Sequence, residues 1–131
     1  MKIRMDYVTN SSSSSFIIAR HKNCTVDEVK AMLYDLKDDI KRLIRSYDGD
    51  FDSSYAREIQ AAYDNDDLDE AVRLAIEEIA SDLMWTRGLT LGDWEVGSMY
   101  ASNEDGILSS CILYDFGWNM GTEYIKFMRG E

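Results

Sequence analysis

The sequence predicts an α+β fold: an antiparallel sheet, made of N-terminal strands and a C-terminal hairpin, with two to three helices packed on one face. Between residues 25 and 83 apolar residues recur at helical spacing, whereas the segments on either side alternate with the two-residue period of strands. Helices and strands are therefore segregated along the chain. A length of 131 residues fits a single domain covering 1–131.

Two strands are expected at the N-terminus. Ile3, Met5 and Tyr7 alternate with charged residues, as in a half-buried strand, and the apolar run 16–20 is rich in β-forming residues. The serine run 11–15 is expected to be the loop that connects them. An anion-binding nest of backbone N–H groups is the alternative for these serines.

Three helices are expected in the middle of the chain. Thr25 and Glu28 form a capping box, which predicts that a helix begins there. One apolar stripe then continues to residue 47 and predicts a single helix over 25–47: Val29, Leu33, Leu36, Ile40, Leu43 and Tyr47. A shorter helix is expected from residue 53 or 54 to 63, and a third begins at 65 or 66 and stops before Gly88.

The C-terminal part returns to strand patterns. Trp94, Val96, Ser98 and Tyr100 alternate with their neighbours, a turn is expected at 103–106, and the run 107–116 is interpreted as the second strand of an antiparallel hairpin. The tail 123–129 is expected to be a further strand or a helix, because the pattern is too short to separate the two.

Negative charge is concentrated in one segment. The chain has a net charge of −11, and residues 48–82 hold twelve acids and two bases, a net charge of −10. Such a segment repels nucleic acids and anionic membranes and attracts a basic protein surface, so we expect no direct nucleic-acid or membrane binding. The candidate partner-binding residues are Asp48, Asp50, Asp52, Asp64, Asp66, Asp67, Asp69, Glu70 and Glu77.

The acids do not match a known metal motif. Asp48, Asp50 and Asp52 resemble the opening of a calcium loop, but Ser53 stands where that loop needs glycine and Ile59 where it needs glutamate. We therefore expect a solvated acidic turn and no cofactor. A divalent-metal site at 48–52 or 64–70 is the alternative.

Catalytic signatures are also missing. His21 and Cys24 suggest zinc or thiol chemistry, but only Cys111 could join them, which leaves a structural zinc site one ligand short. Cys111 is expected to lie within a strand as a core residue. The sequence contains no nucleophile elbow, phosphate-binding loop or zinc-protease motif, so a non-enzymatic role is favoured.

The segment 8–17, Val8-Thr9-Asn10 followed by five serines, Phe16 and Ile17, resembles an N-terminal signature of small uncharacterised bacterial and phage proteins. This resemblance implies a bacterial or phage-related origin and transfers no catalytic residue. In size and acidity the chain is also similar to phage-encoded inhibitors of host nucleases such as anti-CRISPR proteins, which implies a protein that mimics nucleic acid.

The expected function is therefore a small acidic protein-binding domain that occupies the basic, nucleic-acid-binding surface of a partner protein. One alternative is a small enzyme that uses carboxylates or a divalent metal. Another is a self-associating structural protein, a homodimer formed through the near-heptad stripe of 25–47. Because Asp6 interrupts any apolar signal segment, a cytoplasmic location is expected.

Overall fold

The computed structural model describes residues 13–102 and 106–130. The elements in chain order are β2 (Ser13–His21), α1 (Val26–Tyr34), α2 (Lys37–Ser46), α3 (Ala56–Asp64), α4 (Leu68–Met84), β3 (Gly88–Leu91), β4 (Trp94–Ser102), α5 (Leu108–Phe116), η1 (Gly117–Asn119) and β5 (Ile125–Gly130). The α+β class is confirmed. The described residues form five α-helices, which corrects the expected two to three. The strand expected at residues 2–7 lies outside the described part.

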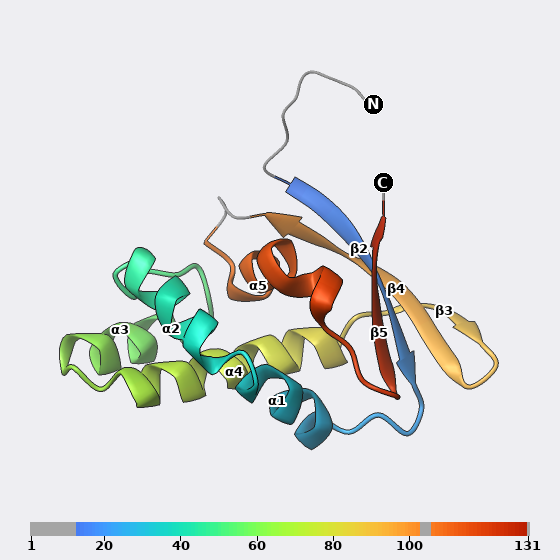
Figure 1. Cartoon of the computed structure of the whole chain (residues 1–131), viewed down its shortest axis with the longest axis horizontal. Helices are drawn as coiled ribbons and strands as arrows, with labels where there is room; N and C mark the ends of the chain where they lie inside the picture. Colours follow the sequence, from blue (N-terminus) through green and yellow to red (C-terminus); the bar gives the residue numbers. More distant parts are fainter. Residues whose placement is uncertain (1–12, 103–105, 131) are drawn as a thin grey trace, which may run out of the picture.

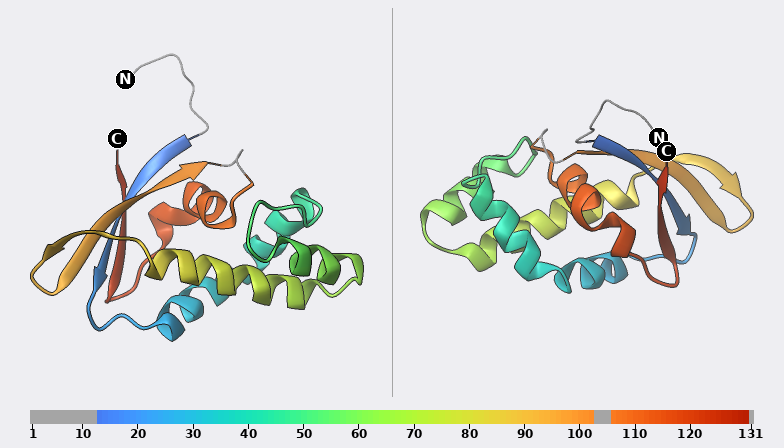
Figure 2. Two further views of the ribbon diagram at one scale, coloured as in Figure 1. Left: turned by 180° about the vertical axis from the view of Figure 1, so that it is seen from behind. Right: turned by 45° about the horizontal axis from the view of Figure 1, so that its top comes forward.

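The sheet has four antiparallel strands in the order β3-β4-β2-β5. Figures 1 and 2 show the helices gathered on one side of it. Phe16 and Ile18 on β2 point toward the helices and are buried, while Ile17 between them points to the other face and is 38% exposed. This confirms the strand predicted at 16–20 and gives the sheet one covered face and one open face.

β2 begins earlier than the sequence indicates. Ser14 and Ser15 pair with Ala101 and Tyr100 of β4, so the prediction that the serine run is a connecting loop is wrong from Ser13 onward. The ladder satisfies the backbone groups of these serines, and this pairing outweighs their weak preference for strands.

The single helix expected over 25–47 is wrong, because the chain forms α1 and α2 with a bend between them. Thr25 caps α1 as predicted, with its Oγ1 accepting a hydrogen bond from Glu28 N at 3.2 Å. Leu36 leaves the helical conformation, with φ −105° and ψ 16°, and α2 starts at the next residue. A straight helix over 26–47 would be about 33 Å long. It would therefore extend beyond α4, the 17-residue helix on which α1 and α2 both pack and which is about 26 Å long.

The bend keeps the apolar stripe on the core. Of the stripe, Val29, Leu33 and Ile40 are fully buried and Leu36, Leu43 and Tyr47 are partly buried against the same core, which also contains Ile44 of α2. The apolar stripe that the expected homodimer would use is therefore packed against the core of the same chain.

The structure confirms the two other predicted helices: α3 corresponds to the one expected to end at residue 63, and α4 to the one expected to begin at 65 or 66. α4 follows the expected apolar positions, and Val72, Ala75, Ile76, Ile79 and Leu83 are all buried in one core cluster. Among the described residues, no helix combines the length and the apolar character needed to cross a membrane.

The second half of the expected C-terminal hairpin is wrong, because residues 108–116 form α5. This helix packs against β4 on one side and α4 on the other. All six residues from Leu108 to Leu113 are buried. Ser109 and Ser110 are buried together with the apolar residues, so this part of α5 has no exposed polar side and its pattern cannot be distinguished from that of a buried strand.

The hairpin that does form joins β3 to β4 through Gly92 and Asp93. Leu91 pairs with Trp94, and Gly92 takes a φ of +62°, as a two-residue hairpin turn requires at that place. The sequence reasoning missed β3 because it treated Gly88 only as a helix stop. The tail, left open between strand and helix, is the strand β5.

Candidate functional site

The acidic segment begins at the end of the molecule that lies away from the sheet, and its later part, α4, runs from there toward the sheet (Figure 1). We call residues 48–67, α3 with its two flanking turns, the acidic end. The two turns are connected, because Tyr63 OH near the end of α3 donates a hydrogen bond of 3.1 Å to Asp48 Oδ1. Asp48 and Asp66 both adopt a positive φ, 56° and 61°, a conformation that aspartate tolerates better than most residues.

The turn between α2 and α3 is anchored by an aromatic side chain. Phe51 is only 3% exposed and packs edge-on against Tyr47, with ring centroids 4.9 Å apart. Asp50 and Asp52 flank it in the sequence and are exposed. The buried ring therefore holds the turn in place while its two neighbours present carboxylates to solvent.

Six of the nine predicted partner-binding residues are exposed and form no ion pair with any Lys or Arg that the structure describes. They are Asp48, Asp50, Asp52, Asp64, Asp66 and Asp67. Asp67 also caps α4 by accepting a hydrogen bond from Glu70 N at 3.2 Å, and Asp64 accepts one from Gln60 Nε2 at 2.9 Å. These six acids all belong to the acidic end.

The other three predicted residues lie on α4 and are paired within the chain. Asp69 lies 3.1 Å from Lys41 Nζ on α2, and Glu77 lies 2.7 Å from Lys30 Nζ on α1. Glu70 accepts two hydrogen bonds from Arg73, at 2.8 and 2.7 Å, and this pairing lowers the pKa of Glu70.

These three carboxylates are therefore already compensated by local cations, and their charge is less available to a partner. The structure divides the predicted set into a free group at the acidic end and a paired group along α4.

A hollow of about 620 Å³ lies beside the acidic end. Lys41 and Arg45 of α2 line it together with residues of the α3–α4 turn, including Asp66, Asp67 and Asp69. The hollow is therefore lined by both basic and acidic side chains. The outermost carboxylates of the acidic end therefore face solvent, whereas those in the hollow face basic side chains of α2.

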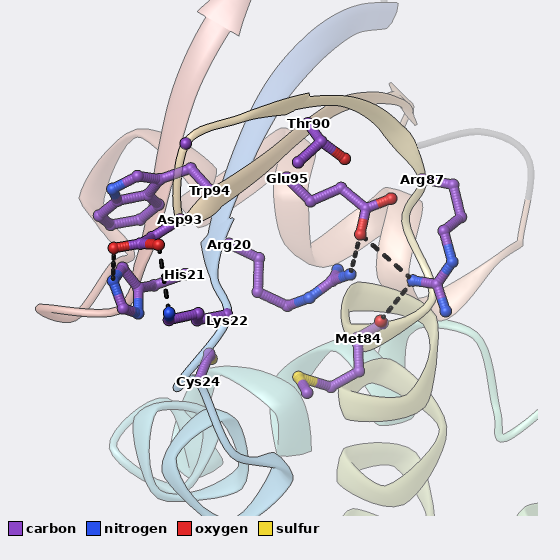
Figure 3. A pocket seen from close by; sticks show the side chains of 11 residues that line it. Arg20, His21, Lys22, Cys24, Met84, Arg87, Thr90, Asp93, Trp94 and Glu95 are labelled. Atoms are coloured by element: carbon purple, nitrogen blue, oxygen red, sulfur yellow. Dashed lines mark hydrogen bonds and ion pairs between the residues drawn. The ribbon is translucent and has the colours of Figure 1, made fainter.

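A second cavity, of about 400 Å³, lies at the hairpin end of the sheet (Figure 3). Arg20 of β2 is 9% exposed and crosses to α4, where it donates to Leu83 O at 3.2 Å and to Thr86 O at 3.0 Å. Its guanidinium also donates to Glu95 Oε1 at 3.2 Å. These bonds satisfy carbonyls at the end of α4, so Arg20 fastens that helix to the sheet.

Sequence reasoning missed this role of Arg20. The available signal was its position two residues after Ile18, on the face of the strand that is buried.

His21 lines the same cavity as Cys24, whose backbone N–H donates to His21 O at 2.9 Å, but among the described residues no cysteine side chain contacts the imidazole. Its Nδ1 accepts a hydrogen bond from Asn23 N at 3.0 Å, and its Nε2 lies 4.0 Å from Asp93 Oδ2. Its ring packs against Trp94 and Tyr124, with centroids 5.0 and 5.2 Å away. These contacts orient the imidazole toward a carboxylate and aromatic rings.

The two cysteines are buried and separate. Burial raises the pKa of the Cys24 thiol, which keeps it protonated and weakly nucleophilic. Cys111 lies in α5, which corrects the expectation that it belongs to a strand, and its Sγ is 3.5 Å from Tyr47 OH. Within the described residues, no three His, Cys, Asp or Glu side chains are grouped closely enough to hold a metal ion.

The chain matches no protein-family model, no curated protein and no solved structure. The resemblance of segment 8–17 to phage proteins therefore stays a prediction. The function has to be argued from the two ends of the molecule, the acidic end and the sheet.

Proposed function

We propose that this protein is a non-enzymatic binding domain whose acidic end docks on a basic surface of a partner protein. The observation that carries the proposal is the gathering of six exposed carboxylates in residues 48–67, none paired with a Lys or Arg among the residues that the structure describes. A basic surface would supply the cations that the fold itself does not provide.

The proposed contact set is narrower than the acidic segment as a whole. Asp50, Asp52 and Asp64 are exposed and do not line the neighbouring hollow, where the basic side chains of Lys41 and Arg45 lie. Asp69, Glu70 and Glu77 contribute less, because a partner cation would have to displace Lys41, Arg73 or Lys30. Exposed charges of this kind act mainly on the rate of association, which depends on salt, and they change affinity through that rate.

The finer proposal is that the partner's basic surface normally binds nucleic acid, so that this protein competes with nucleic acid for it. Unpaired carboxylates offer the same sign of charge as phosphates. Acids one helical turn apart recur about every 5.4 Å, whereas phosphates of one DNA strand recur about every 3.4 Å, so the mimicry is one of charge and not of spacing.

The test begins with affinity capture from a bacterial lysate, with and without nuclease treatment. The affinity of the captured protein is then measured for two variants that raise the net charge equally. Asp50→Lys/Asp64→Lys changes the acidic end, and Asp35→Lys/Glu123→Lys changes exposed acids elsewhere.

We expect the first variant to weaken binding about tenfold or more and the second to stay within about twofold of the parent. Raised salt should weaken binding by the parent, and added nucleic acid should displace it. Equal affinities for the parent and the Asp50→Lys/Asp64→Lys variant would refute the proposal. If the Asp50→Lys/Asp64→Lys variant loses binding but nucleic acid does not displace the parent, only the finer proposal would be refuted.

A further inference from the structure

The face of the sheet that the helices do not cover is apolar. The described helices lie on one side of the sheet in all three ribbon views (Figures 1 and 2). On the opposite face the exposed fractions of the large apolar side chains are 38% for Ile17, 70% for Leu89, 58% for Leu91, 57% for Tyr100 and 65% for Met128. These five residues come from all four strands.

The strand register places these side chains next to one another. Leu91 pairs with Trp94, Leu89 with Val96, and Ile17 with Met128. Residues directly opposite each other in antiparallel strands have their side chains in contact range, so the exposed apolar groups form a continuous patch. We call it the outer sheet patch. Continuous apolar patches of this kind on a folded protein mark interaction surfaces.

The outer sheet patch differs from the rest of the surface in charge. Among the described strand residues that point outward, none is a carboxylate and only Lys126 carries a fixed positive charge. A basic partner would find no counter-charge here. Two copies of a chain with a net charge of −11 repel each other most weakly where acids are absent, which is this face.

We propose that the occupant of the outer sheet patch is a second copy of this chain, packed face to face about a two-fold axis. A two-fold contact brings the same patch from each copy together, which suits a surface whose large exposed side chains are mostly apolar. The two sheets would lie about 10 Å apart, as in a β-sandwich. The contact would then bury the same apolar groups in both copies.

The size of the patch sets the strength of the contact. The strands have 9, 9, 6 and 4 residues, which at about 3.3 Å per residue and about 4.8 Å per strand gives a footprint of about 440 Å² for each copy. Two such footprints fall below the area of a typical stable interface. The dimer is therefore weak, with a dissociation constant on the order of 10 to 100 μM.

The dimer would have a consequence for binding. The outer sheet patch and the acidic end lie on opposite sides of the molecule (Figure 1), so both acidic ends of the dimer would face away from the contact. The dimer would present two docking surfaces to a partner and bind a repeated basic surface more tightly than the monomer.

Sedimentation of the full chain from about 5 to about 500 μM, a range that brackets the expected dissociation constant, tests the proposal. Leu89→Glu/Met128→Glu places two charges in the patch. Val26→Glu/Trp118→Glu is the matched control, because it adds the same charge at apolar residues that are 41% and 69% exposed outside the sheet. All four side chains are exposed, and circular dichroism checks that each variant folds.

The parent and the control should approach dimer mass as concentration rises, and the patch variant should stay a monomer. Added salt should strengthen the dimer by screening repulsion, whereas it weakens docking by the acidic end, so the two proposals fail separately. A parent that stays monomeric at the highest concentration would overturn the proposal. This result is expected if the occupant of the outer sheet patch is the N-terminal segment or another protein. A patch variant that dimerises like the parent would also overturn the proposal.

Discussion

Tyr63 on α3 donates a hydrogen bond of 3.1 Å to Asp48 Oδ1 in the turn that follows α2. The bond raises the pKa of Tyr63, because the carboxylate holds the hydroxyl proton, and burial and the Asp48 charge add to the effect. The Tyr63 ring also packs against Gly49, where a Cβ atom would lie 3.1 Å from Tyr63 Cβ. The position of the α2–α3 turn in the acidic end therefore depends on Tyr63.

Tyr63→Phe should lower the free energy of unfolding slightly, since the substitution removes an exposed hydrogen bond and keeps the ring. Urea denaturation measures the change. Tyr34→Phe is the control, because the Tyr34 hydroxyl is exposed and makes no hydrogen bond to the residues that the structure describes. Equal losses in the two variants would show that the bond to Asp48 contributes nothing.

Arg20→Met should destabilise the fold strongly. The substitution leaves Leu83 O and Thr86 O without their donor, and it leaves Glu95 with only the longer ion pair to Arg87, at 4.0 Å. Removing one member of a largely buried ion pair costs about 3 kcal/mol. Thermal or chemical denaturation gives the value.

Arg42→Met is the matched control for Arg20. Arg42 is exposed and pairs with Asp39 on the same helix, so its loss should cost less than about 1 kcal/mol. A cost for Arg20→Met no larger than that of the control would mean that Arg20 does not fasten α4 to the sheet.

Glu78→Gln should change how stability depends on pH. Glu78 is 9% exposed in α4, and burial, with the nearby Asp82 charge, raises its pKa. A carboxyl whose folded pKa is raised stabilises the fold fully below its unfolded pKa and loses that contribution as pH rises through the folded pKa.

The variant should therefore gain stability relative to the parent as pH rises from about 4 to about 7. Gln keeps an oxygen that can accept the hydrogen bond from Tyr55 N, which is 3.3 Å long in the parent. Unfolding curves at several pH values follow the difference, and Glu58→Gln, an exposed position on α3, should track the parent. A difference that does not vary with pH would contradict the prediction.

Gly117→Ala should destabilise the core because there is no room for a methyl group. A Cβ atom at Gly117 would lie 2.7 Å from Cε2 and Cζ of Phe16, which is fully buried. Overpacking of this kind costs about 1–3 kcal/mol. Denaturation of Gly117→Ala, Phe16→Leu and the double variant measures the coupling, and the double variant should lose less stability than the two single losses together. Strict additivity would refute the steric explanation.

The acids of the candidate site could be found in the sequence, but their partners could not. Asp69, Glu70 and Asp66 look alike within the segment 64–70. In the structure Lys41, far away in the sequence, pairs with Asp69, while Asp66 forms no ion pair with a described cation. Which acids remain available depends on how α2 packs against α4.

Local patterns were reliable where a helix or strand has one apolar and one polar side. α4 and the cap of α1 by Thr25 follow directly from spacing and from residue type. The bend at Leu36 was missed because no glycine or proline marks it. The reason for the bend is tertiary, because it allows both halves of the apolar stripe to pack against the core.

By itself the sequence determined the fold class, the negative charge in the middle of the chain and the core face of α4, because each follows from the composition or spacing of neighbouring residues. Only the tertiary structure decided that residues 108–116 are a helix, since Leu108 to Leu113 of α5 are all buried and no alternation of buried and exposed positions reveals the helical period there. It also decided that the acids separate into paired and free groups and that the described helices cover only one face of the sheet. Both depend on contacts between residues that are distant in the chain.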